Sequence, residues 1–252
     1  MARIPVALQL FTVRQLLAED YVGTLKEVKA LGYDLVQLTG SLPFEAPEMR
    51  EVLDDIGLQP VGIHVGGDQL TDNLEHWADY AKTVGTKDLV WPYVAEGQRE
   101  TLEDWERLAA TMDEVGARCR ELGVRLSYHN HSFEFVKFDG QYALDLLYSK
   151  TDPENLLAEI DTYWVKHGGE DPAAYIRKYA GRQAILHLKD MADDEDQSFA
   201  EIGNGILDWE DIHQAAIEAG VEYYAVEQDR CPGDPLDSAR MSIEFIRENM
   251  SD

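Results

Sequence analysis

The stretch CRELGVRLSYHN, residues 119–130, combines three features that decide the fold. Its first residues end a segment with helical periodicity, Gly123 follows, and an apolar run begins at Val124. Glycine readily adopts the left-handed backbone conformation that ends many helices, so this order predicts a helix, a tight turn and a buried strand. The chain therefore passes from a helix directly into a strand.

The same unit recurs along the chain. Glycine also separates a helical segment from an apolar run in VKALGYDL, LDDIGLQP, AKTVGTKD and AIEAGVEY. The strand candidates are residues 5–10, 33–39, 59–65, 87–94, 124–130, 155–161, 183–189 and 222–228. Strands that alternate with helices are parallel, and eight such units close naturally into a barrel. The sequence predicts one (β/α)8 barrel domain over residues 1–252. Because the fifth helix, around residues 142–151, is short, a doubly wound open sheet is the alternative.

The composition limits the partners of the protein. Acidic residues number 49 against 22 basic ones, and the formal net charge of -27 would repel nucleic acid and anionic membranes. A solvated acidic surface and adaptation to high salt both explain this charge. Cys119 and Cys231 show no CxxC spacing, which argues against a disulfide framework or a thiolate zinc site. The N-terminal apolar run is too short for a signal peptide, and we find no apolar stretch of about 18 residues. We therefore expect a cytoplasmic protein without nucleic-acid or membrane partners, and a homo-oligomer is compatible with the sequence.

Polar residues gather at the predicted carboxyl ends of the strands, where barrels assemble their active sites. They are Gln9, Gln37, His64, Trp91, His129, Asn130, His131, Glu159, Asp161, His187, Lys189, Glu227 and Asp229. Any one of them could simply be a hydrogen-bonded structural residue, but the pattern on all eight strands favours a site. Asp161 is nearer the strand end than Glu159, so Asp161 is the better metal ligand and Glu159 is expected to pair with a neighbour. Oxygen ligands with one imidazole suit Mn²⁺, Mg²⁺ or Co²⁺, with Mn²⁺ favoured and Zn²⁺ still compatible.

The motifs HNHSFEF, EIDTYW, LHLKD, IGNGILDW and VEQD occur in this order along the chain. Together they resemble the xylose isomerase-like TIM-barrel superfamily of sugar isomerases and epimerases, which also includes inosose dehydratases. The resemblance covers essentially the whole chain. It implies one divalent metal ion held by carboxylates and a histidine, with Asp161, His187 and Glu227 as the ligands from strands six to eight.

The fifth strand departs from the pattern of the epimerases, which have a glutamate at its end. Here His129 is near that position, and the nearest glutamate is Glu134. We expect Glu134 to complete the metal site, because Glu, Asp, His and Glu make a hard ligand set. His129 or His131 is then free for proton transfer. In the alternative, a histidine binds the metal and Glu134 serves the substrate.

The resemblance implies proton transfer at a carbon next to a carbonyl group that the metal polarises. Glu227 and His129 are the expected proton-transfer residues, with Glu134 as a further catalytic candidate. The substrate-binding candidates are His64, Trp91, His131, Lys189 and Gln9. Core packing is an equally good explanation for Trp91. The expected substrate is a small unphosphorylated sugar or keto-sugar, because no GxxxxGK phosphate loop is present.

Three other functions compete with an isomerase or epimerase. A dehydratase or lyase acting on a keto-sugar or inosose would use the same metal site. An endonuclease IV-like nuclease is disfavoured by the charge of -27 and by a total of only seven histidines. A barrel that binds without catalysis is disfavoured because Asp161, His187 and Glu227 are present.

Overall fold

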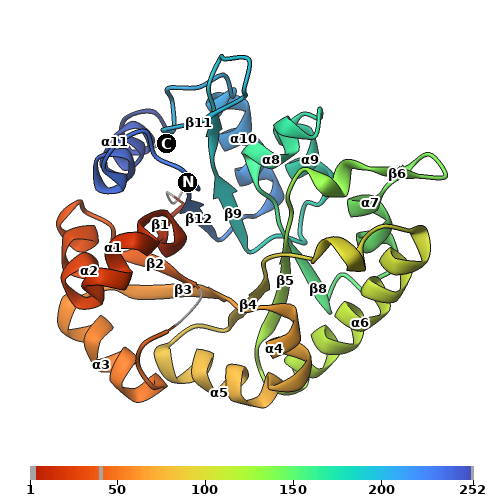
Figure 1. The fold of residues 1–252 in the computed structure, drawn as a ribbon, viewed down its shortest axis with the longest axis horizontal. Helices are drawn as coiled ribbons and strands as arrows, with labels where there is room; N and C mark the ends of the chain where they lie inside the picture. Colours follow the sequence, from red (N-terminus) through yellow and green to blue (C-terminus); the bar gives the residue numbers. More distant parts are fainter. Residues whose placement is uncertain (1–3, 40–41, 251–252) are drawn as a thin grey trace.

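The computed structural model describes residues 4–39 and 42–250. Eight parallel strands form its central sheet, and helices surround them (Figure 1). The sheet strands are β1 (Val6–Gln9), β2 (Leu35–Thr39), β3 (Gln59–His64), β4 (Asp88–Trp91), β5 (Arg125–His129), β8 (Leu156–Glu159), β9 (Ile185–Leu188) and β12 (Tyr223–Val226). Each strand lies within one of the eight apolar runs predicted to be strands, so all eight predictions are confirmed.

The strands close into a barrel. Their hydrogen-bonded order is β8-β5-β4-β3-β2-β1-β12-β9. The first and last strands of this order, β8 and β9, are joined by isolated parallel bridges between Ala158 and Gln183 and between Asp161 and His187. The backbone N–H of His187 donates to the carbonyl of Ile160 at 2.9 Å across the same seam. The fold is therefore the predicted (β/α)8 barrel and not a doubly wound open sheet.

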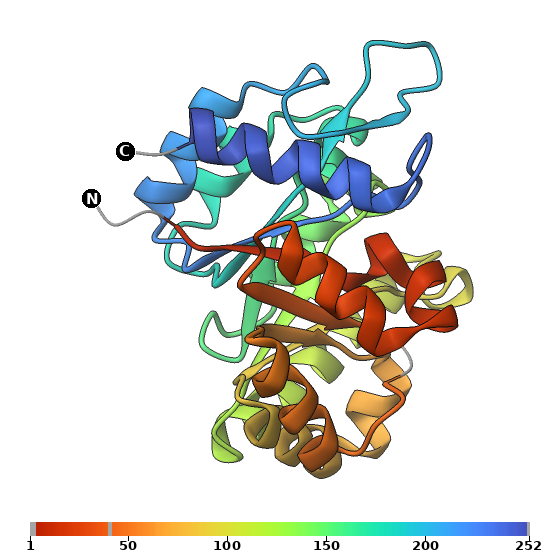
Figure 2. The same ribbon diagram turned by 90° about the vertical axis from the view of Figure 1, so that its left-hand side faces the viewer.

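The helices pack around the barrel, as the side view also shows (Figure 2). They are α1 (Arg14–Glu19), α2 (Tyr21–Ala30), α3 (Ala46–Ile56), α4 (Gly67–Asp72), α5 (Leu74–Val84), α6 (Leu102–Glu121), α7 (Ala143–Ser149), α8 (Thr162–His167), α9 (Pro172–Lys178), α10 (Trp209–Ala219) and α11 (Pro235–Asn249). The fifth unit is indeed short, since α7 has seven residues. None of the helices described combines the length and hydropathy that a bilayer span requires.

Short elements add to the barrel loops. The 3-10 helices are η1 (Leu10–Val13), η2 (Glu96–Gln98) and η3 (Phe133–Phe135). Two antiparallel pairs are β6 (Lys137–Phe138) with β7 (Gln141–Tyr142), and β10 (Asp190–Met191) with β11 (Phe199–Ala200). The second pair follows β9 and extends from the carboxyl end of the barrel beside α8 (Figure 1).

The glycines between helices and strands have the predicted role. Gly57 ends α3 with φ 80°, and Gly220 ends α10 with φ 75°. Side chains disfavour this left-handed region, so glycine lets the chain leave the helix and enter the next strand without strain. Local sequence therefore sets the helix-to-strand turns of the barrel.

The barrel interior changes from apolar to polar along the strands. A small buried cluster of Ala7, Val61, Ala184, Ile185 and Ala225 fills one level. Residues two positions further along β1, β9 and β12 are Gln9, His187 and Glu227, and all three are buried. Because alternate residues of a strand share a face, these polar side chains point into the barrel above the apolar cluster. The fold thus collects them at the carboxyl end.

Candidate active site

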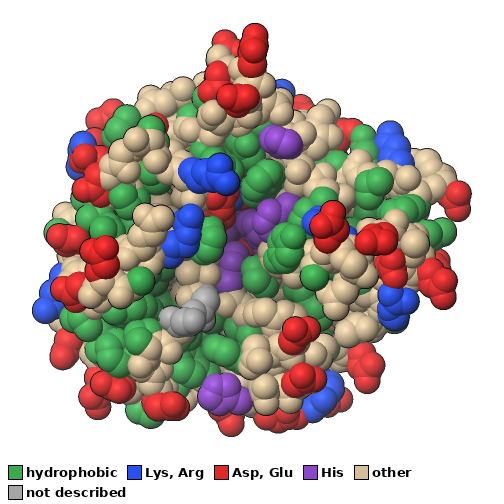
Figure 3. All heavy atoms as spheres, viewed as in Figure 1, with side chains coloured by type: hydrophobic (Ala, Val, Ile, Leu, Met, Phe, Trp, Pro, Cys, Tyr) green, Lys and Arg blue, Asp and Glu red, His purple; other side chains and the backbone are tan. Residues whose placement is uncertain are grey.

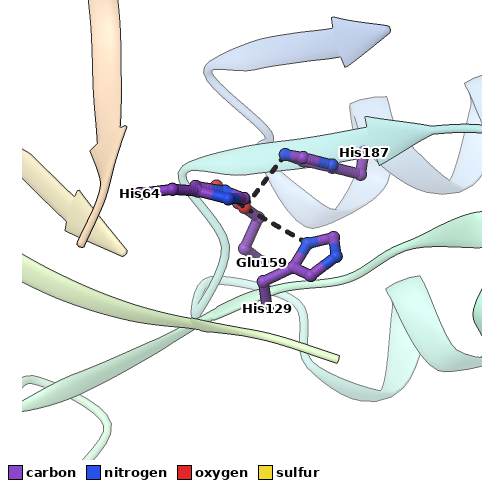
Figure 4. A group of neighbouring side chains, drawn as sticks. All are labelled: His64, His129, Glu159 and His187. Atoms are coloured by element: carbon purple, nitrogen blue, oxygen red, sulfur yellow. Dashed lines mark hydrogen bonds and ion pairs between the residues drawn. The ribbon is translucent and has the colours of Figure 1, made fainter. Parts of the chain in front are cut away.

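Glu159, at the end of β8, is the centre of a buried polar group (Figure 4). Its Oε1 lies 2.7 Å from His64 Nε2, 2.9 Å from His187 Nε2 and 3.3 Å from His129 Nδ1. Its Oε2 accepts a 2.7 Å hydrogen bond from Gln37 Nε2. Four strands therefore send side chains to one carboxylate, and Glu159 pairs with its neighbours as expected.

A second group lies beside the first and shares two histidines with it. His129, Asp161, His187 and Glu227 each offer one nitrogen or oxygen atom, and these atoms lie within 4.8 Å of one another. We call these four residues the metal-ligand group. They come from β5, from the ends of β8 and β12, and from β9. These four strands are consecutive in the closed barrel. In the space-filling view, histidine side chains lie in a hollow at the centre of the face that is turned to the viewer (Figure 3).

Each of the two shared imidazoles has a carboxylate group near both of its nitrogens. His187 Nδ1 lies 3.2 Å from Glu227 Oε2 and 3.9 Å from Asp161 Oδ2, while Nε2 faces Glu159. His129 Nε2 lies 3.9 Å from Asp161 Oδ2, while Nδ1 faces Glu159. Glu159 therefore lies beside both rings, on the side away from Asp161, as an ion-pair partner. The hydrogen bond of His187 Nε2 is with Gln37 Oε1 at 2.7 Å, and His129 Nδ1 has none among the residues described.

The donors of this group fit a divalent ion. Asp161 Oδ1 accepts the backbone N–H of Trp164 at 2.9 Å and caps α8, whereas the buried Oδ2 has no hydrogen bond among the residues described. Two carboxylates with two imidazoles suit first-row divalent metals. Metal-binding histidines commonly bond their other nitrogen to a carboxylate, which is the place that Glu159 occupies here. His129, Asp161, His187 and Glu227 could therefore hold the ion.

Lys189 contributes a positive charge next to the metal-ligand group. Its buried ammonium lies 2.7 Å from Glu227 Oε2 and 3.0 Å from both Asp161 Oδ2 and Asp229 Oδ2. None of these contacts meets hydrogen-bond geometry in the described part of the chain. The buried ammonium therefore partly balances three carboxylates.

Burial and charge shift the pKa values of the group in different directions. Burial, with the nearby His187, lowers the pKa of His129 to about 3, which favours the neutral imidazole that binds metals. Burial also opposes the charged form of His187, but Glu159 and Glu227 outweigh it and raise the pKa to about 10. Burial raises the pKa of Asp161 to about 6 despite Lys189. The carboxylates of Glu159 and Glu227 therefore raise the pKa of His187, whereas burial dominates at His129 and lowers its pKa.

The structure places Glu134 in a different setting. Its Oε1 accepts a 2.6 Å hydrogen bond from the Tyr128 hydroxyl, and its Oε2 accepts one of 2.9 Å from the backbone N–H of His131. Burial raises the pKa of Glu134 to about 7. Over residues 4–39 and 42–250, neither group of potential metal ligands contains it. Glu134 instead holds the loop that carries His131.

His131 lies at the edge of the site. Its ring stacks on Phe133 with 5.3 Å between centroids, and it lies 5.1 Å from the ring of His129 and 5.3 Å from that of Trp164. Its buried Nδ1 has no hydrogen-bond partner among the residues that the structure describes. The ring as a whole is only half-buried, so His131 borders the site.

The other predicted substrate-binding residues divide into two sets. Gln9 lies near the site, and its Nε2 donates to Gln37 Oε1 at 2.7 Å. Trp91 instead belongs to the main core, and a Cβ added to Gly67 of α4 would lie 2.0 Å from the Trp91 ring. The period of two explains this direction, since Trp91 shares the outward face of β4 with Leu89. The structure therefore brings Gln9, His64, His131 and Lys189 to the site but not Trp91.

Two supporting residues were not assigned a role from sequence. Gln37 Oε1 lies 2.7 Å from His187 Nε2, and Asn130 Oδ1 accepts the backbone N–H of Asp161 at 3.1 Å. The parity of Gln37 on its strand was a usable signal, because it matches that of the other inward residues. Asn130 follows the strand, where parity no longer applies.

Comparisons with known proteins agree with the motifs. Residues 25–249 match the family model described as xylose isomerase-like TIM barrel, which confirms the resemblance. The chain is 28% identical over 170 residues to an inosose dehydratase of Lacticaseibacillus casei, an alignment that covers 60% of this chain and 56% of that protein. It is 26% identical over 263 residues to an inosose dehydratase of Geobacillus kaustophilus, covering 88% and 85% of the two chains.

A solved structure has the same fold. It is a sugar phosphate isomerase/epimerase from Parabacteroides distasonis, with a TM-score of 0.84 and 21% identity. The match covers 99% of this chain and 95% of that one. The chain thus spans just over half of the L. casei relative but nearly all of this structural neighbour.

Proposed function

Because the chain belongs to the xylose isomerase-like TIM barrel family, we propose that it is a divalent-metal-dependent enzyme. The proposed reaction is proton transfer at a carbon next to the carbonyl of a small sugar or keto-sugar, as in an isomerase or epimerase. The observation that carries this proposal is the metal-ligand group, four buried donors that converge at the carboxyl end of the barrel.

We propose His129, rather than Glu134, as the ligand from the fifth barrel strand. Both carboxylate oxygens of Glu134 already accept hydrogen bonds, from Tyr128 and His131. His129 Nε2 faces Asp161, and its Nδ1 lies 3.3 Å from Glu159 Oε1. Asp161, His187 and Glu227 complete the proposed ligand set. Mn²⁺ remains the preferred ion for this mixture of oxygen and imidazole donors.

When bound, such an ion supplies the Lewis acidity that makes a carbon next to a ketone acidic enough to lose a proton near neutral pH. His131 is our choice for moving this proton, since its half-buried ring lies at the edge of the site, 5.1 Å from the ring of His129. Glu227 is the second proton-transfer candidate, and epimerisation needs a group on each face of the substrate. Lys189 and His64 would bind substrate hydroxyl groups through their N–H donors.

A dehydratase is the second candidate, favoured by the two relatives named inosose dehydratase. Loss of water needs a base for the C–H proton and an acid near the departing hydroxyl group. His131 and Lys189 could supply these two roles. The proposed site therefore has the groups for either reaction. Which one occurs depends on whether the substrate has a hydroxyl group positioned to leave.

The test has two independent parts. First, metal analysis of the purified protein should find one divalent ion per chain, and its absence after reloading would refute the metal proposal. Second, the loaded protein should be incubated in D₂O with ketoses and inososes and followed by NMR. Deuterium at one carbon of a product that has lost no water indicates an isomerase or epimerase, whereas loss of water indicates a dehydratase. A protein that binds metal but promotes neither change would refute the proposed reaction.

A further inference from the structure

A cavity of about 760 Å³ lies beside the metal-ligand group. It is lined by residues of α8, the β10–β11 loop and the segment after β12, among them Tyr163, Trp164, Phe199 and Asp229. Of the four residues of the metal-ligand group, none lines it within the described chain. A reacting group held by those ligands would therefore leave this cavity to another part of the substrate.

Asp229 and Lys189 connect the cavity to the site. Asp229 lines the cavity, and its Oδ2 lies 3.0 Å from the Lys189 ammonium, which in turn lies 2.7 Å from Glu227 Oε2. The same ammonium lies 5.5 Å from the Trp164 ring and 5.8 Å from the Phe199 ring. The cavity therefore adjoins the proposed metal site, with Lys189 between them.

Aromatic side chains form one wall of the cavity. Tyr163 packs on Phe199 with 4.4 Å between ring centroids, and Trp164 lies 4.8 Å from Tyr163 and 5.8 Å from Phe199. The wall is fixed to the site, because Asp161 caps α8 through the backbone N–H of Trp164. A half-buried tryptophan offers a flat apolar surface that suits the apolar face of a ring.

We propose that the substrate carries a second ring, which stacks on Trp164 while the reacting sugar lies over the metal-ligand group. Cavities of about 300 to 1,000 Å³ hold ligands of drug size, which are larger than one monosaccharide. The polar side chains of Gln197, Ser198 and Arg230 also line the cavity and suit a ring with hydroxyl substituents. The second ring is a sugar or an aromatic aglycone, which share a flat apolar face. This inference rests on the proposed function, since it extends the substrate of the same site.

Binding of defined probes tests the inference without turnover. Dissociation constants for glucose, cellobiose and phenyl β-D-glucoside should be measured by calorimetry, with and without Mn²⁺. We expect at least one two-ring probe to bind about tenfold more tightly than glucose, a gain of the size that aromatic stacking supplies. Tighter binding of cellobiose alone identifies a sugar as the second ring, and tighter binding of the phenyl glucoside alone identifies an aromatic aglycone.

The Trp164→Ala variant should lose this gain and keep its affinity for glucose. Phe199→Leu, a milder change of the same wall, should reduce the gain without removing it. Trp77→Ala is the matched control, because Trp77 of α5 is also a half-buried tryptophan and does not line this cavity in the structure described. Two-ring probes that bind no more tightly than glucose, or an equal loss for all probes in Trp164→Ala, would overturn the inference.

Metal content separates this inference from the proposed function. If the protein binds Mn²⁺ but does not prefer two-ring probes, the inference fails and the metal site stands. If it prefers two-ring probes through Trp164 but binds no divalent ion, the cavity assignment stands and the proposed function fails.

Discussion

Glu159 Oε1 lies 2.9 Å from Nε2 of His187, while the other nitrogen of the same ring faces Glu227 at 3.2 Å. The imidazole is therefore held between a deep carboxylate and a proposed metal ligand. A carboxylate behind a metal-binding histidine fixes the ring and its tautomer. This relationship makes Glu159 a positioning residue for the metal site.

Replacing Glu159 with Gln should weaken metal binding by about 10- to 100-fold, the usual cost of losing such a partner. Glu134→Gln is the matched control, because it changes another fully buried glutamate that lies outside the metal-ligand group. Calorimetric titration with Mn²⁺ measures both variants. Equal metal affinities in the two variants would contradict the role of Glu159.

His129 and His131 should respond differently to replacement by alanine. His129→Ala should lose tight metal binding, since it removes one of four proposed ligands. His131→Ala should keep the metal and lower turnover of the identified substrate by about 10² to 10⁴, the range for one proton-transfer group. Metal analysis and steady-state kinetics distinguish them. A His129→Ala protein that retains its metal would restore Glu134 as the candidate ligand.

Glu134 should make stability depend on pH. Its pKa rises from 4.5 to about 7 on folding, chiefly through burial. Its protonated form therefore favours the folded state fully below about pH 4.5, and this contribution is lost as the pH rises through 7. Relative to the wild type, Glu134→Gln should gain stability between pH 5 and 8, by at most about 3 kcal/mol. Urea unfolding with EDTA measures this difference, and a constant difference across the range would refute the prediction.

An ion pair at the opposite end of the barrel should affect stability without affecting the site. Arg125 contacts Asp88 through Nε at 2.6 Å and Nη2 at 2.8 Å, and the Asp88 side chain is only 3% exposed. Arg125→Ala leaves this carboxylate buried without its partner and should cost about 3 to 5 kcal/mol. The double variant Arg125→Ala, Asp88→Asn should recover part of the loss. Metal affinity should be unchanged in both, since the amino ends of barrel strands serve stability.

The net charge of -27 should make the protein more stable in salt. Self-repulsion destabilises a compact, highly charged chain, and about 1 M salt reduces the screening length to roughly 3 Å. We expect the unfolding temperature to rise between 0.05 and 1 M KCl, as measured by calorimetry. A falling temperature would indicate that specific ion pairs outweigh the repulsion. In the low-salt buffer, duplex DNA should show no binding.

The sequence determined the barrel because its signals are local. A glycine after each of several helices, Gly57 and Gly220 among them, sets a turn that its own φ angle explains. The period of two predicted that His187 and Lys189 share a face of their strand. Both signals act within a few residues, so they need no knowledge of distant contacts.

Only the tertiary structure decided which side chains of different strands contact one another. Glu134 is five residues after His129 in the sequence, yet its carboxylate bonds Tyr128 and His131, whereas Glu159 reaches His129 from another strand. Trp91 turned to the helical side because Gly67 leaves space for its ring. Barrel closure joins β8 to β9 and sets these distances, and closure depends on the register of all eight strands. The residue types of the site were therefore readable along the chain, but their pairing was fixed by contacts between strands.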